Sequence, residues 1–203
     1  ILGKLFGLLP VFLLLTFAAT TDPLSKKDKK FAINYFKETR KDLQDAVKNL
    51  SEAQLNWKPA DSVWSIAECV EHITLSEKNL FDFAQNSLKE AANPDKRKEL
   101  KFPDDNDVIK IVTDRSVKVK TREGFIPSNQ FGSTQKTLDV FVERRNNLIN
   151  YVKKTDDDLR NHYVAMPFGL FDTYQFLLFL SAHTKRHTLQ IEELKANPGF
   201  PKS

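Results

Sequence analysis

Apolar residues recur every three or four positions in four long stretches of the chain, which is the spacing of an amphipathic helix. The stretches span about residues 29–50, 65–92, 128–152 and 172–195, and charged or polar residues fill the positions between the apolar ones. Each such helix has one apolar stripe that it must bury against a neighbour. The pattern therefore predicts an all-α fold, a four-helix bundle.

Two of these helices have clear start signals. Ser65 is followed three residues later by Glu68, which is the pattern of a capping box, so we expect the second helix to begin there. Asp172 is followed by Gln175 and predicts the N-cap of the fourth helix. Asn197, Pro198 and Gly199 should stop that helix.

The segments between the helices are predicted to be loops, and the segment between the second and third helices is the longest. Residues 56–63 and 155–171 contain helix-breaking residues. Within residues 93–129, the pattern fits a short helix in 105–119 or a brief strand at 116–120, and the sequence does not decide between them. A connection this long is uncommon unless it packs over another part of the molecule or has a function.

The first residues form a different kind of segment. Leu5 to Ala19 is apolar, follows Lys4 and is shorter than a comfortable bilayer span, which is the layout of a secretory signal peptide. The mature protein would then be exported, periplasmic or extracellular, and free of the membrane; without cleavage the segment would be an N-terminal anchor. The expected organisation is signal peptide 1–21, linker 22–28, bundle 29–198 and C-terminal tail 199–203.

Composition narrows the class of protein. The chain has 203 residues, 40% of them hydrophobic, which suffices for one domain with a sizeable core. The formal net charge of +4 is modest, and basic and acidic residues are interleaved, whereas a nucleic-acid binder usually has a basic stripe. We therefore expect no nucleic-acid partner. The single cysteine, Cys69, excludes an intrachain disulfide and a Cys-rich zinc site.

The strongest candidate chemistry is a group of three histidines. His183 and His187 are four residues apart, so their rings lie on one face of the fourth helix, on its apolar stripe. His72 lies at the edge of the apolar stripe of the second helix. If these rings converge, three nitrogen ligands and an open position would form a catalytic transition-metal site. The alternative is a set of buried histidines bonded to backbone or water. His162, in a polar loop, is expected at the surface.

Three further residues lie near the histidines and each has two interpretations. Glu68 is a general base or a support for a ligand, or it only caps its helix. Cys69 is an additional soft ligand or a redox-active thiol, or a small buried apolar residue. Gln190 orients a ligand or contacts substrate, or it is a hydrogen-bonded core amide. The sequence leaves these alternatives open.

Two segments of the chain resemble a known family. Trp64–Ile73, with the sequence WSIAECVEHI, is similar to the second-helix signature of the DinB-like (DinB/YfiT) superfamily. Ser181–Ile191, SAHTKRHTLQI, is similar to its fourth-helix signature. The resemblance covers about residues 29–198 and implies an up-down-down-up bundle with a long connection between helices two and three.

The resemblance also implies a function. It places one divalent metal, zinc, nickel or iron, on His72, His183 and His187, and it implies a homodimer. Relatives include S-transferases and isomerases that use low-molecular-weight thiols. We expect a metal-dependent transferase or hydrolase acting on an unidentified small molecule. The alternative is a non-catalytic bundle that binds a metal or ligand, and a solvent-reachable fourth coordination position would separate the two hypotheses.

Overall fold

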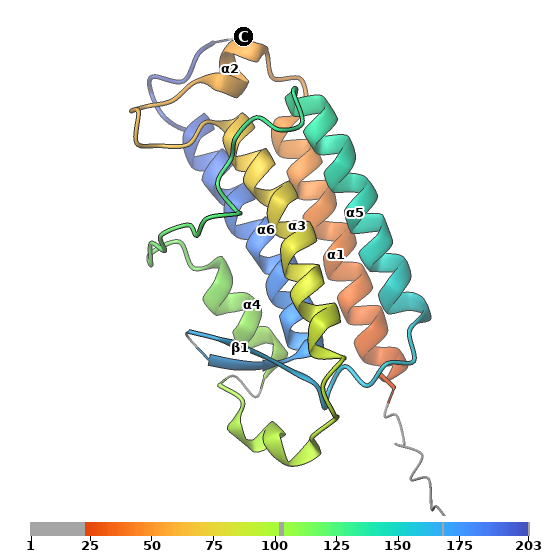
Figure 1. Ribbon diagram of the computed structural model, residues 1–203. Helices are drawn as coiled ribbons and strands as arrows, with labels where there is room; N and C mark the ends of the chain where they lie inside the picture. The colour runs from red at the N-terminus through yellow and green to blue at the C-terminus, as the bar shows by residue number, and fades with distance from the viewer. Residues whose placement is uncertain (1–22, 102–103, 168, 203) are drawn as a thin grey trace, which may run out of the picture.

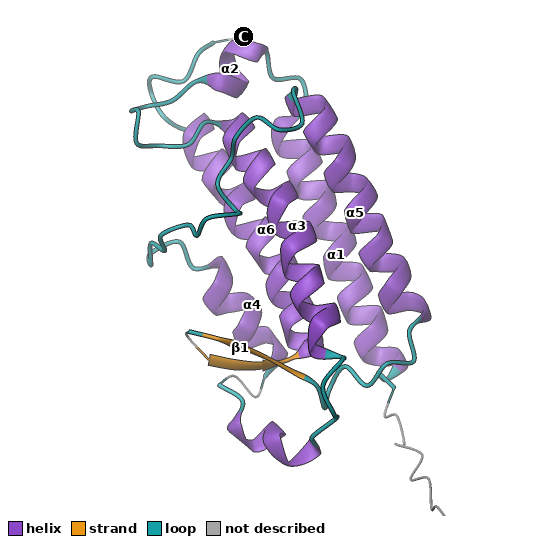
Figure 2. Cartoon of the chain, viewed as in Figure 1, coloured by secondary structure: helices purple, strands orange, loops and turns teal. Residues whose placement is uncertain are grey.

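The computed structural model describes residues 23–101, 104–167 and 169–202, and within them helices dominate (Figures 1 and 2). The predicted signal segment, residues 1–21, lies outside the described residues. In chain order the elements are α1 (Lys26–Val47), α2 (Glu52–Asn56), α3 (Ile66–Ser87), the 3-10 helix η1 (Pro94–Glu99), α4 (Asp105–Thr113), α5 (Thr134–Lys154), β1 (Tyr163–Met166), β2 (Gly169–Asp172) and α6 (Thr173–Lys195).

The four long helices α1, α3, α5 and α6 form a bundle, as the pattern of apolar residues predicts. Each packs against two others: α6 against α1 and α3, and α5 against the same pair. Figure 1 shows α1 and α6 running toward one end of the bundle and α3 and α5 running toward the other. Because α3 and α5 are parallel, the chain between them must return along the whole bundle, which explains the long connection.

The predicted start signals of α3 and α6 are confirmed. The Ser65 hydroxyl accepts from the amide of Glu68, while the Glu68 carboxylate accepts from the amide of Ser65 at 2.7 Å. The Asp172 carboxylate accepts from the amide of Gln175 at 2.7 Å. The first helix starts earlier than predicted, at Lys26, because Ser25 serves as its N-cap.

Other boundaries differ from the predictions. α1 ends at Val47 rather than near residue 50, and α3 ends at Ser87 rather than near residue 92. The short helix α2, with its own capping box at Ser51, precedes the loop at 56–63. The segment predicted as loop 155–171 contains strand β1 and part of β2, which pair antiparallel from Tyr163 opposite Asp172. These elements are too short for apolar periodicity to reveal them.

The open choice within residues 93–129 is decided in favour of a helix. Residues Asp105–Thr113 form α4, which packs against α6 with Val108 and Val112 buried. Among the described residues, the strands are β1 and β2, and residues 116–120 belong to neither. A strand needs a partner for its backbone, and here the carbonyl of Val117 accepts instead from the side chain of Arg186.

The core is divided by a buried polar layer. Arg145 of α5 is 0% exposed and binds both carboxylate oxygens of Glu77 of α3, at 2.7 and 2.8 Å. Its other donors reach the hydroxyls of Thr39 in α1 and of Ser181 and Thr184 in α6. One side chain therefore connects all four long helices, with an apolar cluster on either side of this layer.

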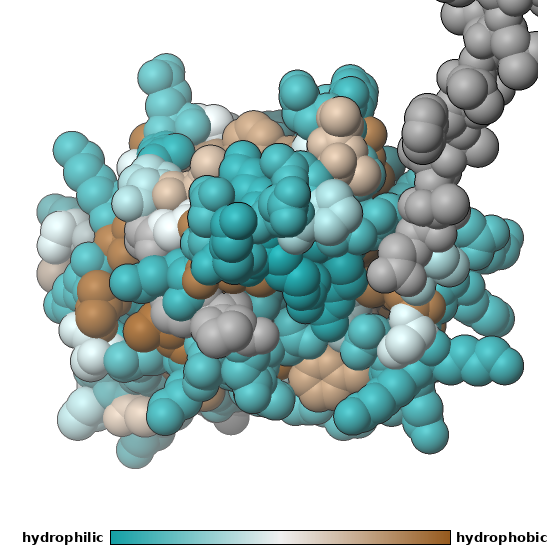
Figure 3. Space-filling view, turned by 90° about the horizontal axis from the view of Figure 1, so that it is seen from below, coloured by the Kyte–Doolittle hydropathy of each residue, from teal (hydrophilic) through white to brown (hydrophobic). Residues whose placement is uncertain are grey.

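The surface is mostly hydrophilic at the end of the bundle that carries the hairpin, where apolar side chains appear only in separate groups (Figure 3). No helix in the described part of the chain is long and apolar enough to cross a membrane.

Candidate metal centre

The structure brings the three predicted histidines together. His72 lies in the second turn of α3, and His183 and His187 lie one turn apart on α6, which packs against α3. The Nε2 atom of His72 is 3.3 Å from that of His183 and 3.1 Å from that of His187. One nitrogen from each ring falls within 4.8 Å of both others. His162 lies elsewhere, partly buried, with its Nδ1 2.7 Å from the carbonyl of Asp158.

Hydrogen bonds at the other ring nitrogens determine which nitrogen carries the proton. Nδ1 of His72 is 2.7 Å from the carbonyl oxygen of Phe125, which can only accept, so Nδ1 is the donor. Nδ1 of His187 donates in the same way to Oε1 of Gln190 at 2.9 Å. The Nε2 atoms of both neutral rings therefore present lone pairs toward the centre of the group.

This arrangement fits a transition-metal ion. Zinc–nitrogen bonds are about 2.0–2.1 Å long, and two such nitrogens at a tetrahedral angle lie about 3.3 Å apart. The Nε2 separations of 3.1 and 3.3 Å agree with that geometry. Lone pairs that face one another at this distance repel unless a proton or cation lies between them. The donor set and its spacing therefore match a three-nitrogen metal site.

Burial keeps the rings neutral. It lowers the pKa of His72 to about 4, although the hydrogen bond to Phe125 opposes the shift. It also lowers the pKa of His187 to about 3, and the charge that His72 would carry adds to this effect. The pKa of His183 lies well below its ordinary value, first because of burial and then because of His187. Neutral imidazole is the form that binds metals.

Two aromatic rings pack against the group. The ring of Trp64 lies 4.7 Å from that of His72 and 6.2 Å from that of His187, measured between centroids. Phe179 stacks on His183 at 6.3 Å. Nδ1 of His183 is buried and has no hydrogen-bond partner in the described part of the chain, so no hydrogen bond at that nitrogen orients the ring.

The residues that hold the rings in place come partly from the long connection. Phe125 lies within it, and so does Arg115, which donates to Oε1 of Gln190 at 3.3 Å and binds both oxygens of Glu193. Glu71, next to His72 in α3, is 6% exposed and accepts from the backbone amides of residues 128–130. Sequence patterns missed Glu71, Arg115 and Phe125.

Of the three other residues predicted near the histidines, Gln190 contacts the group, whereas Glu68 and Cys69 have structural roles. Gln190 contacts His187 directly, as one of its two interpretations required. The Glu68 carboxylate is bonded to the Ser65 amide and to Lys58, which is the capping interpretation. Cys69 is 0% exposed within an apolar cluster, and burial raises its pKa to about 12, so its thiol is protonated at neutral pH. Cys69 behaves as a small core residue.

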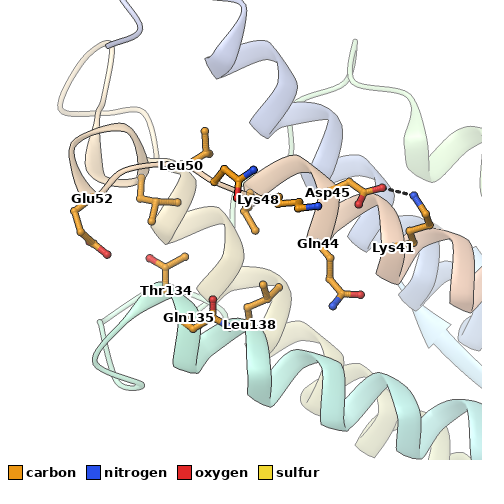
Figure 4. Close-up of a pocket in the computed structure, with 12 residues that line it drawn as sticks. Lys41, Gln44, Asp45, Lys48, Leu50, Glu52, Thr134, Gln135 and Leu138 are labelled. Atoms are coloured by element: carbon orange, nitrogen blue, oxygen red, sulfur yellow. Dashed lines mark hydrogen bonds and ion pairs between the residues drawn. The ribbon is translucent and has the colours of Figure 1, made fainter. Parts of the chain in front are cut away.

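A separate surface hollow lies between α1, α2 and the start of α5 (Figure 4). Its volume is about 560 Å³, and it is lined by mixed charged and apolar side chains such as Lys41, Lys48, Glu52 and Leu138. None of the three histidines lines it, so it is distinct from the candidate metal centre.

A bundle with this helix order and three converging histidines defines a class of metal-binding four-helix proteins. The sequence profile of the DinB superfamily matches residues 35–191, so this chain belongs to the DinB superfamily. The resemblance noted in the helix signatures is thereby confirmed.

Two similar proteins come from Bacillus subtilis. YuaE of strain 168, an uncharacterized protein, is 30% identical over 169 residues, which are 80% of this chain and 96% of YuaE. The solved structure of YfiT covers 89% of this chain and 93% of its own, with a TM-score of 0.62 and 16% identity. YfiT is described as a probable metal-dependent hydrolase with an unusual four-helix bundle topology, and at this identity the likeness shows the shared fold.

Proposed function

We propose that this protein holds one divalent transition-metal ion, zinc, nickel or iron, on His72, His183 and His187, and that it is a metal-dependent hydrolase. The observation that carries the proposal is the convergence of three Nε2 atoms, with separations of 3.1 and 3.3 Å from that of His72. The description of YfiT as a probable metal-dependent hydrolase favours hydrolysis over thiol transfer.

An ion held by these histidines would supply Lewis-acid chemistry, which can lower the pKa of a water molecule toward neutrality and so generate a nucleophile. The residues of the chain hold the site ready for that chemistry. The Phe125 carbonyl and the Gln190 amide oxygen fix the orientation of His72 and His187. Glu71 is not a free base, because backbone amides occupy its carboxylate.

The ligand assignment is tested by elemental analysis of the purified protein and of a His183→Ala variant. The wild type should contain close to one equivalent of metal, and the variant should contain little. His162→Ala is the matched control, because this fourth histidine lies outside the group. Equal metal content in wild type and His183→Ala would remove the ligand assignment.

The reaction class is tested with a panel of nitrophenyl esters and amides, and in parallel with thiol-conjugation substrates. The metal-loaded protein should hydrolyse members of the first panel, and His183→Ala should fall to the rate of metal-free protein. Thiol conjugation without hydrolysis would contradict the hydrolase and support a transferase. A metal-loaded protein inactive in both panels would support a non-catalytic bundle.

A further inference from the structure

Residues 114–130, here called the crossing segment, run along α3 and α6 between α4 and α5 (Figure 1). Several of its apolar side chains face solvent: Val117 is 59% exposed, Val119 76% and Ile126 52%. Apolar burial by these residues therefore contributes little to its position. Phe125 is partly buried against an apolar cluster of the bundle, and specific polar contacts hold the rest of the segment in place.

The strongest of these contacts is made by Glu71. One carboxylate oxygen accepts from the amides of Ser128 and Gln130, at 3.2 and 2.9 Å, and the other accepts from the amide of Asn129 at 2.8 Å. Asn129 has a φ of +60°, which turns the successive amides toward one carboxylate. Asn79 of α3 adds a bond to the carbonyl of Gly124 at 3.0 Å.

Two arginines hold the other end. Arg115, within the crossing segment, pairs with Glu193 of α6 at 2.7 and 2.8 Å and reaches Gln190. Arg186 of α6 donates to the carbonyls of Asp114 and Val117 in the segment. Arg186 precedes His187 directly and Glu193 follows it on α6, so this end of the segment is tied to the helix that carries two of the three histidines.

These anchors have a consequence for the histidines. The crossing segment supplies the Phe125 carbonyl that orients His72, and its Arg115 holds the Gln190 oxygen that orients His187. We propose that the crossing segment is a clamp on the metal site, with Glu71 and Arg115 as positioning residues that set metal affinity without touching the ion. This inference rests on the proposed metal binding.

Such a clamp couples metal binding thermodynamically to the ordering of the crossing segment. If fixing the segment favours the ligand geometry, a bound ion must favour the fixed segment by the same factor. Loosening the segment should therefore weaken metal binding, and removing metal should loosen the segment. The two effects can be measured separately.

Zinc affinity tests the first effect, by competition with a chromophoric chelator. Glu71→Gln replaces one acceptor oxygen by an NH₂ group that faces amide donors, and it should weaken zinc binding about 10- to 100-fold, as is typical of residues that support metal ligands. Arg115→Gln, at a partly exposed pair, should weaken it by a smaller factor. Glu123→Gln, exposed on the same segment, is the control with the same change in charge and should bind as wild type does.

Limited trypsin digestion tests the second effect at Lys118, Lys120 and Arg122, which are all exposed. Zinc should slow cleavage there in the wild type, and Glu71→Gln without metal should be cleaved faster than metal-free wild type. Arg115→Gln keeps the inference testable if Glu71→Gln fails to fold.

The outcomes separate the two proposals. Zinc bound by wild type, with unchanged affinity in Glu71→Gln and Arg115→Gln, overturns the clamp and leaves the metal site standing. Cleavage of wild type that zinc does not slow also overturns the clamp. A wild-type protein that binds no zinc, nickel or iron overturns the metal site and the clamp with it.

Discussion

Burial of the imidazole rings determines the charge of the three histidines and therefore their chemistry. Desolvation by the surrounding protein disfavours the protonated form and is the largest cause of the lowered pKa of each ring. A protein without metal thus keeps lone pairs directed at one another, and this costs stability. The same arrangement leaves the ligands deprotonated and ready for an ion at neutral pH.

This burial predicts the pH dependence of the metal-free protein. The unfolded chain binds protons on His72 and His187 as the pH falls below about 6.5, whereas the folded chain binds them only near pKa values of about 4 and 3. Each histidine should therefore lower the free energy of unfolding by about 1.4 kcal/mol per pH unit below about 6.5, until its folded pKa is reached. Urea unfolding of metal-free protein from pH 7 to 5 measures the slope.

Other groups also titrate in that range, so the comparison with His187→Gln is decisive. The variant lacks one of the titrating rings, and its stability should fall less steeply with decreasing pH than that of wild type. Identical slopes for the two proteins would mean that His187 is not held neutral by the fold.

At the scale of single elements, the caps position the ligands along their helices. His72 lies seven residues after Ser65, so the start of α3 determines the level at which the ring meets α6. α6 begins at Thr173 because Asp172 caps it, and both α6 histidines follow from that start. The local signals that predict the helices therefore also place the three rings at comparable heights in the bundle.

The Ser65 cap should be measurable on its own. Ser65→Ala removes the acceptor of the Glu68 amide and should cost about 1 kcal/mol of stability. Ser62→Ala, at an exposed position in the preceding loop, should change stability by less than about 0.5 kcal/mol. The difference in urea midpoint between the two variants is the measurement, and equal midpoints would show that the capping box contributes nothing.

For the whole molecule, the Arg145 layer joins the four long helices in one arrangement. The Arg145–Glu77 pair is almost fully buried, with side chains 0% and 2% exposed. The hydroxyls of Thr39, Ser181 and Thr184 accept the remaining donors. Such a layer specifies which faces of the helices meet, because any other packing would leave a buried charge without partners.

Glu77→Gln should therefore destabilise the protein by about 3–5 kcal/mol, because it leaves the buried guanidinium uncompensated. Lys78→Gln on the same helix breaks only an exposed pair with Asp82 and should cost less than about 1 kcal/mol. Chemical denaturation of both variants compares the two sites. A loss below about 1 kcal/mol for Glu77→Gln would show that the layer is not a constraint on the fold.

Export and dimerisation, also properties of the whole molecule, stay predictions from the first residues and from the family resemblance. Fractionation of cells that express the full chain, and the mass of the purified protein in solution, address these two points directly.

Apolar periodicity and capping patterns in the sequence determined the four long helices, and the spacing of His183 and His187 placed two rings on one face. These are local properties, because helix faces and caps depend on residues three or four positions apart. The short elements α2, β1 and β2 were not predicted, because apolar periodicity cannot be detected over so few residues.

Only the tertiary structure decided what surrounds the histidines. Phe125 is 53 residues from His72, and residues 128–130 are 57 to 59 residues from Glu71. Arg145 meets Glu77 across 68 residues. No sequence period links such positions. They meet because α3 and α5 run parallel, so the chain that connects them, which includes the crossing segment, must return along the bundle. The candidate metal-ligating histidines can thus be predicted from the sequence, whereas the contacts that hold them in place arise from the path of the backbone.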